Sequence, residues 1–343
     1  MSITSTQVST LRDSYGRVAR DLRVSLTDRC NLRCTYCMPA EGLPWIPGPE
    51  VLTDAEIVTL VRVAVEQLGV RTVRFTGGEP LLRPGLADIV ASTRALVTDL
   101  GGAPDVSLTT NGVTLARHAD RLAAAGLQRV NVSLDTLDRE RYAALARRDR
   151  LPQVLAGIAA ADAAGLRPLK VNAVVMRGVN EDDVLPLADF CLERGYRLRF
   201  IEHMPLGPRH TWDRTAMVTA EEILAALGRR YDLEAAPARR ATPSEDWLVS
   251  QGGAQLGTVG VIASVTRPFC AACDRTRLTA DGQVRTCLFS QAETDLRTPL
   301  RDGARDADLA ALWVGAHAAK PAGHGIDTAD FAQPTRTMSA IGG

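Results

Sequence analysis

Short β-branched runs alternate with longer Ala- and Leu-rich segments along the first two-thirds of the chain. The short runs are typical of buried strands, and the apolar spacing of the longer segments is typical of helices. Strands are expected at Leu22–Leu26, Thr72–Phe75, Val106–Thr109, Arg129–Leu134, Leu169–Val175 and Arg197–Ile201. Helices are expected at Asp54–Leu68, Leu86–Leu100, Leu115–Ala125, Val154–Ala164 and Asp182–Glu193.

Local signals mark the ends of several of these helices. Thr53 followed by Glu56 is typical of a capping box, which satisfies free backbone N–H groups at a helix start. Gly69, Gly126 and Gly165 stand where helices should stop, as glycine does when the chain turns into a left-handed conformation. The signals therefore support the same division into helices and strands.

The alternation predicts the α/β class, with a parallel sheet and right-handed crossovers. Six strand–helix units are too few for the eight-stranded closed barrel, so we expect a partial (β/α)6 TIM-like barrel over residues 11–205. Residues 206–343 form a smaller C-terminal region with a different pattern. Its expected elements are Trp247–Val249, Leu256–Val261, Thr276–Thr279 and a helix at Asp308–Ala319.

Composition places the chain among globular proteins, with 45% hydrophobic and 23% charged residues. No apolar run reaches the roughly 20 residues that span a bilayer, and the N-terminus lacks the apolar core of a signal peptide. A cytoplasmic protein without a membrane partner is expected. The 40 basic residues balance the 40 acidic ones, which argues against general nucleic-acid binding. Lys170 and Lys320 are the only lysines; every other basic residue is arginine.

The 7 cysteines form two groups of three and a singleton. An odd number without an export signal argues against a disulfide framework. Cys191 lies in an apolar helical pattern and is expected to be a buried core thiol. The two groups are candidate metal sites.

Cys30, Cys34 and Cys37 follow the first expected strand with C-x3-C-x2-C spacing. Thiolates suit zinc or iron–sulfur clusters, and this loop supplies only three of them. A 4Fe–4S cluster held by three cysteines would keep one iron open for a small molecule. A zinc ion closed by a distant histidine, or reduced structural cysteines, are the alternatives.

Cys270, Cys273 and Cys287 have C-x2-C-x13-C spacing, which also resembles half of a zinc ribbon. A fourth zinc ligand would have to be His317, His324 or Cys191. Arg275 and Arg277 alternate on one face of a short strand, and arginine forks suit phosphate oxygens and base edges. No G-x-x-x-x-G-K-[ST] sequence is present, so any triphosphate would bind to scattered cationic residues.

The first cysteine loop, with Tyr36 before its last cysteine, resembles the radical S-adenosylmethionine (SAM) superfamily. The segment Thr76–Pro80, at the end of the second expected strand, resembles that superfamily's Gly-Gly-Glu-Pro motif. The resemblance implies a 4Fe–4S cluster whose open iron binds SAM. One electron from it would cleave SAM to a 5′-deoxyadenosyl radical.

Longer motifs resemble the GTP 3′,8-cyclase family, also called molybdenum cofactor biosynthesis protein A. They are Leu22–Asn31, Phe200–Met204, Phe269–Arg277 and the terminal Gly342-Gly343. The resemblance covers residues 11–343 and implies a radical SAM lyase. It would convert GTP to (8S)-3′,8-cyclo-7,8-dihydroguanosine 5′-triphosphate, the first step of molybdenum cofactor biosynthesis.

The resemblance implies roles for individual residues, with no protein side chain as acid or base. Two 4Fe–4S clusters would be held by Cys30, Cys34 and Cys37 and by Cys270, Cys273 and Cys287. SAM would contact Tyr36, Gly78, Ser133 and Met204. GTP would contact Arg23, Arg74, Thr109, Lys170, Arg275, Thr276 and Arg277. Gly342 and Gly343 would reach into the active site.

The expected partners are GTP, a protein that donates electrons and, by pathway, a downstream cyclic pyranopterin monophosphate synthase. The chain would be a monomer or homodimer. Two other hypotheses stay open at this point. One is a radical SAM enzyme that matures a peptide or another enzyme, and the other is a zinc-stabilised nucleic-acid-binding module.

Overall fold

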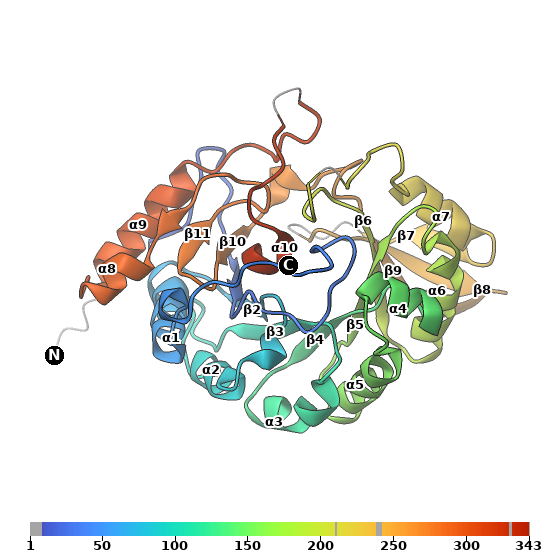
Figure 1. The fold of residues 1–343 in the computed structure, drawn as a ribbon, viewed down its shortest axis with the longest axis horizontal. Helices are drawn as coiled ribbons and strands as arrows, with labels where there is room; N and C mark the ends of the chain where they lie inside the picture. Colours follow the sequence, from blue (N-terminus) through green and yellow to red (C-terminus); the bar gives the residue numbers. More distant parts are fainter. Residues whose placement is uncertain (1–8, 210, 238–241, 329–330, 343) are drawn as a thin grey trace.

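One twelve-stranded sheet runs through the chain in the computed structural model, which describes residues 9–209, 211–237, 242–328 and 331–342 (Figure 1). Its strand order is β12-β11-β10-β1-β2-β3-β4-β5-β6-β9-β8-β7. The central strands β1–β6 are all parallel, which confirms the predicted partial barrel. Their bounds are β1 Asp21–Ser25, β2 Thr72–Thr76, β3 Asp105–Thr110, β4 Arg129–Ser133, β5 Lys170–Val175 and β6 Arg197–Glu202.

Helices surround the outer face of this sheet (Figure 1). They are α1 Asp54–Arg62 with a π-helical continuation Val63–Gln67, α2 Leu86–Arg94, α3 Ala119–Ala124, α4 Arg139–Ala146, α5 Leu151–Ala163 and α6 Val184–Glu193. The predicted capping box forms, with the Thr53 hydroxyl accepting from the Glu56 N–H at 3.2 Å. Gly69, Gly126 and Gly165 all have positive φ angles. None of the helices in the described ranges is long and apolar enough to cross a membrane.

Two helix predictions need correction. The segment expected to continue as helix to Leu100 ends instead at Arg94, and Leu100 is exposed. The chain turns there, because the Thr98 N–H and hydroxyl both donate to the Gly102 carbonyl at 2.8 Å. Helix α4 was not expected, because it is short and lacks a clear apolar stripe.

Alternation along the strands separates an apolar face from a polar one. Side chains such as Leu22, Val24, Val73 and Phe75 point outward beneath the helices and are fully buried. Arginine and other polar side chains take the alternate positions and face the barrel interior. A closed TIM barrel fills that interior with apolar layers, so the polar lining here marks a space for a ligand.

The C-terminal region extends both edges of the same sheet. Strand β10 pairs parallel with β1, and β9 pairs parallel with β6. The elements of this region are α7 Ala220–Gly228, β7 Asp232–Ala235, β8 Glu245–Gln251, β9 Ala254–Ile262, β10 Arg275–Leu278, β11 Gln283–Arg285, β12 Thr294–Asp295, α8 Arg297–Arg301, α9 Asp306–Ala318 and α10 Met338–Ile341. The register places Arg74 of β2, Arg23 of β1 and Arg277 of β10 side by side.

Candidate active site

The first cysteine loop lies at the carboxyl end of β1 and is braced by α4. The Arg33 N–H donates to the Ala146 carbonyl at 3.0 Å, and the Thr35 N–H donates to the Leu145 carbonyl at 2.9 Å. These bonds fix the loop from outside while Cys30, Cys34 and Cys37 remain half-buried. The loop is therefore held in place independently of any bound group.

The surroundings of these thiols make their thiolate forms unfavourable unless a positive charge is added nearby. Burial, and after it the neighbouring thiols, raise the pKa of Cys34 well above its ordinary value, and burial raises that of Cys37 to about 12. Thiolates are therefore costly here unless a cationic centre binds them, as the irons of a cluster do. Donors already face Cys30: the Leu32 N–H at 3.4 Å and the Asn111 amide at 3.8 Å from Sγ. The donor set fits an iron–sulfur cluster.

The Gly-Gly-Glu-Pro segment packs directly on the cysteine loop. A Cβ on Gly78 would lie 2.3 Å from the Arg29 carbonyl oxygen, so only glycine permits this approach. Glu79 is fully buried and accepts hydrogen bonds from the Thr110 hydroxyl at 2.7 Å and the Asn111 N–H at 2.8 Å. Its carboxylate thus ties the end of β2 to the end of β3, and burial raises its pKa to about 7.

The four residues expected to contact SAM lie in separate segments at the strand ends. Ser133 ends β4 and Met204 follows β6. The Tyr36 hydroxyl donates to Asp135 at 2.8 Å, which fixes the orientation of the ring. A Cβ on residue 207 would lie 2.3 Å from the Tyr36 carbonyl oxygen, so Gly207 also belongs to this closely packed region.

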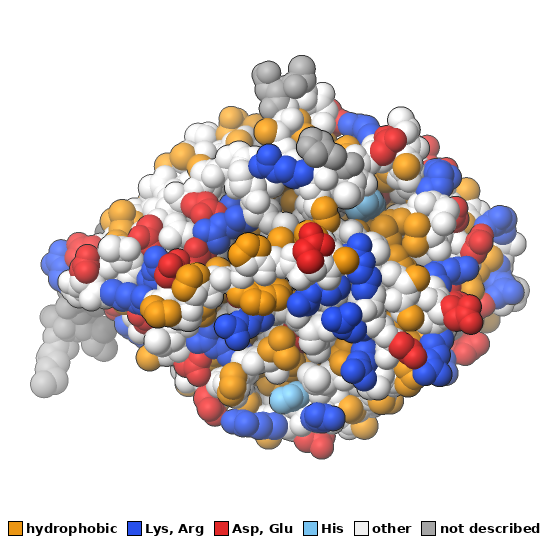
Figure 2. Space-filling model, in the orientation of Figure 1, with side chains coloured by type: hydrophobic (Ala, Val, Ile, Leu, Met, Phe, Trp, Pro, Cys, Tyr) orange, Lys and Arg blue, Asp and Glu red, His pale blue; other side chains and the backbone are white. Residues whose placement is uncertain are grey.

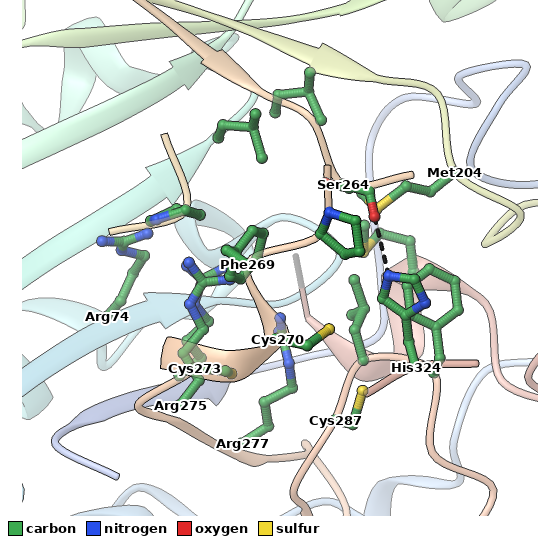
Figure 3. Close-up of a pocket in the computed structure, with 18 of the residues that line it drawn as sticks. Arg74, Met204, Ser264, Phe269, Cys270, Cys273, Arg275, Arg277, Cys287 and His324 are labelled. Atoms are coloured by element: carbon green, nitrogen blue, oxygen red, sulfur yellow. Dashed lines mark hydrogen bonds between the residues drawn. The ribbon is translucent and has the colours of Figure 1, made fainter. Parts of the chain in front are cut away.

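The second cysteine set opens into a cavity in the barrel interior (Figure 3). Cys270 and Cys273 lie on a short 3-10 turn before β10, and Cys287 follows β11. The cavity is lined by cationic, aromatic and apolar side chains together with these thiols. Its lining includes Arg23, Arg74, Thr109, Asn172, Arg199, Met204, Phe269, Arg275, Arg277, Phe289 and His324.

Positive charge dominates this cavity. Burial is the main cause of a lowered pKa at Arg23, and also at Arg277, where the pKa falls to about 10. Neighbouring arginines add to the effect at both. The buried Nε of Arg23 has no hydrogen-bond partner among the described residues. Buried cations that lack partners favour an anionic ligand, such as a triphosphate.

Two residues expected to contact GTP stand apart from the cavity lining. Thr276 is fully buried on the other face of β10, where its hydroxyl accepts from the Trp313 indole at 2.8 Å. Any nucleotide contact would therefore use its main chain. Lys170 begins β5, two residues before the cavity residue Asn172, and it is almost fully buried beside Arg199.

The C-terminal tail lies inside the barrel mouth (Figure 1). Gly342 has a φ of +85°, and a Cβ there would lie 2.9 Å from Thr76 and 3.0 Å from Ser25. Its carbonyl accepts a 2.5 Å hydrogen bond from Arg277. The tail therefore touches both the ends of β1 and β2 and the cavity arginines. Gly343 lies outside the described residues.

Two of the three candidate fourth zinc ligands are engaged or lie in the core, whereas His317 in α9 is buried with its Nε2 unpartnered among the described residues. Both ring nitrogens of His324 are occupied, Nε2 by the Ser264 carbonyl at 3.0 Å and Nδ1 by the Ile326 N–H at 3.1 Å. Cys191 is fully buried in α6, as predicted. Within the described ranges, no three Cys, His, Asp or Glu side chains are placed to hold a metal ion, and this applies to both cysteine sets alike.

Sequence reasoning missed some cavity and loop residues. Arg199 and Asn172 line the cavity from β6 and β5, and the Asn172 Oδ1 is buried without a partner among the described residues. Both lie in strands that were expected, and they are direct neighbours in the register. Both could have been predicted as cavity residues, because they are polar residues at inward-facing positions of adjacent parallel strands. Asn111 could be identified as a site residue only from its contact with Cys30 in the structure.

Comparisons with known proteins agree over nearly the whole chain. Residues 24–191 match the Radical SAM superfamily model, and residues 196–326 match the Molybdenum Cofactor Synthesis C model. The GTP 3′,8-cyclase of Corynebacterium glutamicum is 60% identical, covering 97% of this chain and 89% of the relative. That of Streptomyces coelicolor is 58% identical, covering 97% and 96%. Streptococcus suis SuiB bound to S-adenosylmethionine shares the fold, with TM-score 0.57 and 15% identity over 88% of this chain and 65% of SuiB.

Proposed function

The chain belongs to the GTP 3′,8-cyclase family of radical SAM enzymes, and we propose on this premise that GTP binds in the cavity lined by the second cysteine set. The activity is conversion of GTP to (8S)-3′,8-cyclo-7,8-dihydroguanosine 5′-triphosphate in molybdenum cofactor biosynthesis. One observation carries the binding proposal. The second cysteine set and the buried arginines of β1, β2 and β10 line the same cavity.

We assign the first iron–sulfur cluster to Cys30, Cys34 and Cys37. Tyr36, Gly78, Ser133 and Met204 would hold SAM beside this loop. When bound, the cluster and SAM supply a 5′-deoxyadenosyl radical that takes a hydrogen atom from the ribose of GTP. Asn111 and the Leu32 N–H donate to Cys30 and orient it, while Glu79 holds the adjoining strand ends together.

A second 4Fe–4S cluster is assigned to Cys270, Cys273 and Cys287, facing the guanine base. Arg23, Arg74, Arg275 and Arg277 hold GTP within the cavity, together with Thr109, Lys170 and the main chain at Thr276. Arg199, which also lines the cavity, adds to this set. Fixing both ends of the nucleotide would hold its ribose and base close together. The groups that must bond would then already be near each other, which favours cyclisation. Gly342 lies at the barrel mouth, where its carbonyl accepts from Arg277, and it would limit access of water.

The activity is tested with anaerobically reconstituted protein given SAM, GTP and dithionite. Formation of 5′-deoxyadenosine together with a cyclised GTP product is expected. 5′-Deoxyadenosine formed while GTP stays intact would leave the radical SAM assignment standing and contradict GTP as the substrate. Iron and sulfide analysis on the same sample measures whether two clusters are bound.

GTP binding is expected to take up a proton at Lys170. Burial, followed by nearby arginines, lowers the pKa of this ammonium to about 7. Phosphate groups would raise that pKa, so at pH 8 binding adds a proton, whereas at pH 6 the lysine is already charged. Affinity therefore falls as pH rises above 7, by up to about tenfold per pH unit.

Calorimetry at pH 8 in buffers of different ionisation enthalpy measures this proton uptake. A Lys170→Met variant should bind GTP without it. Equal uptake by the variant and the wild-type protein would contradict the assignment.

We also propose a cytoplasmic location, a protein electron donor, a downstream cyclic pyranopterin monophosphate synthase, and a monomer or homodimer. The donor proposal is supported by an arginine surface, which we define as Arg147, Arg148 and Arg150; the neighbouring Arg139 is paired with Asp149 at 2.8 Å. Arg147 donates to the Arg33 carbonyl at 3.3 Å, so this surface adjoins the first cysteine loop. Lys and Arg side chains gather on this face near the position of α4 (Figure 2). An acidic one-electron carrier such as a flavodoxin fits it.

Reversing charge on the arginine surface should slow reduction by such a carrier. An Arg148→Glu, Arg150→Glu variant is expected to form 5′-deoxyadenosine about tenfold more slowly with reduced flavodoxin at low salt, because both side chains are exposed and steer docking. Dithionite should drive it as fast as the wild-type protein. The matched control is Arg229→Glu, an exposed arginine after α7. An equal loss with dithionite would contradict the docking role.

A further inference from the structure

Lys320 follows α9 and places its ammonium against the second cysteine loop. Its Nζ donates to the Arg275 carbonyl at 2.9 Å and lies 3.3 Å from the Cys273 carbonyl and 3.5 Å from Cys273 Sγ. The side chain is only 4% exposed. A buried cation therefore contacts both the thiol of a proposed cluster ligand and the start of β10.

The charge of Lys320 has no direct counterion. No carboxylate lies within ion-pair distance of its Nζ in the part of the chain that the structure describes. Arg17 provides the contrast, since it donates to the Cys270 carbonyl at 2.7 Å but is also paired with Asp13 at 2.5 Å. The two cations hold neighbouring parts of the same loop, and of the two only Lys320 lacks an ion-pair partner among the described residues.

The two cations reach the loop through different atoms. The Lys320 Nζ lies 3.5 Å from Cys273 Sγ, within hydrogen-bond distance for sulfur, whereas Arg17 donates to the Cys270 main-chain carbonyl. Lys320 therefore acts directly on a sulfur of the loop.

A lysine fits the acceptors around this position better than an arginine would. Elsewhere the chain almost always uses arginine for its cations, and Lys170 is the only other lysine. Three acceptor atoms surround one nitrogen at this point, which matches the compact ammonium with its three donors. A guanidinium spreads its donors over a planar fork and would not direct them all to one spot.

We propose that Lys320 is a positioning residue that raises the reduction potential of the cluster bound at Cys273, an inference that rests on the proposed second cluster. A one-electron reduction adds negative charge that spreads onto the ligating sulfurs. A hydrogen bond and an adjacent positive charge stabilise that reduced form more than the oxidised one. Because Lys320 also holds the Arg275 carbonyl, it fixes the cluster loop relative to the cavity arginines of β10.

The test uses full-length protein in which Cys30, Cys34 and Cys37 are replaced by Ala, so that only the second site can hold a cluster. The reconstituted cluster is titrated electrochemically and followed by electron paramagnetic resonance. Lys320→Met should lower its potential so that, at the midpoint of the parent protein, the ratio of reduced to oxidised cluster falls about tenfold, equivalent to 59 mV for one electron. Lys320→Arg should keep most of the potential.

Arg17→Met is the matched control, because it removes contacts with the Cys270 carbonyl and with the Pro321 and Ala322 carbonyls beside Lys320 while leaving the charge of Lys320 in place. Equal potentials in the parent and in Lys320→Met, or an equal shift in Arg17→Met, would overturn the role of Lys320 alone. A parent that binds no iron would overturn the second cluster and this inference with it. If Lys320→Met fails to retain a cluster, Lys320→Gln makes the same comparison, since it keeps an amide donor without the charge.

Discussion

A Cys273→Ala variant should lose cyclisation of GTP, by at least about 100-fold, while it still binds the first cluster and SAM. Loss of contacts around a metal ligand alone commonly costs 10- to 100-fold, and removing a ligand should cost more. Cys273 lines the same cavity as Arg275 and Arg277, so the empty position would also change how the base is held. The cysteines of the first loop are not part of this cavity lining, and that loop is braced separately by α4.

Product analysis by chromatography and mass spectrometry measures both activities of the variant. Iron content should fall by about half, and 5′-deoxyadenosine should still form slowly with dithionite. Cys191→Ala is the matched control, because this thiol is buried in α6 outside both loops. Undiminished cyclised product from Cys273→Ala would contradict the role assigned to the second cysteine set.

Arg277→Ala should weaken GTP binding by about 100-fold and leave SAM binding nearly unchanged. Arg277 is buried in the cavity wall, and a charged hydrogen bond is worth about 1.5–3 kcal/mol, where each 1.4 kcal/mol is a factor of ten. The substitution also removes the donor to the Gly342 carbonyl. The tail would then lose its contact with the wall of the nucleotide cavity.

Equilibrium calorimetry with GTP and with SAM separates the two effects. Arg277→Lys should recover part of the GTP affinity, because it keeps the charge without the fork. Arg230→Ala, which removes a surface ion pair with Asp189, is the control for loss of an arginine. An equal loss of SAM and GTP affinity in Arg277→Ala would indicate general disruption of the barrel and contradict the assignment.

The central barrel was predictable because its signals are local. Each of β1 to β6 is a short β-branched run, and caps such as Thr53 with Glu56 and turns such as Gly69 mark the helix ends. The cysteine loop and the Gly-Gly-Glu-Pro segment then fall at neighbouring strand ends. Parallel topology brings such ends together, so the first half of the site could be inferred before any contact was seen.

The second half depends on pairings between distant residues. Arg277 stands beside Arg23 only because β10 joins β1, which local sequence does not specify. The same pairing turns Thr276 away from the cavity toward Trp313, although its neighbours on either side face inward. The place of Gly342 between Ser25 and Thr76 likewise requires the complete fold. Resemblance to a family supplied the candidate residues, and the strand register explains which of their side chains face the cavity.

The pairing of β1 with β10 has a consequence for synthesis of the protein. Strand β1 leaves the ribosome first, yet its outer neighbour begins only at Arg275 and the tail that seats beside it ends the chain. During translation the six central strands therefore carry an open edge at β1, which is a site for wrong pairing until the last segments arrive. Oxygen-sensitive clusters would be enclosed only at that final stage. Nascent chains of this enzyme should depend on chaperones for longer than barrels whose first and last strands are formed early.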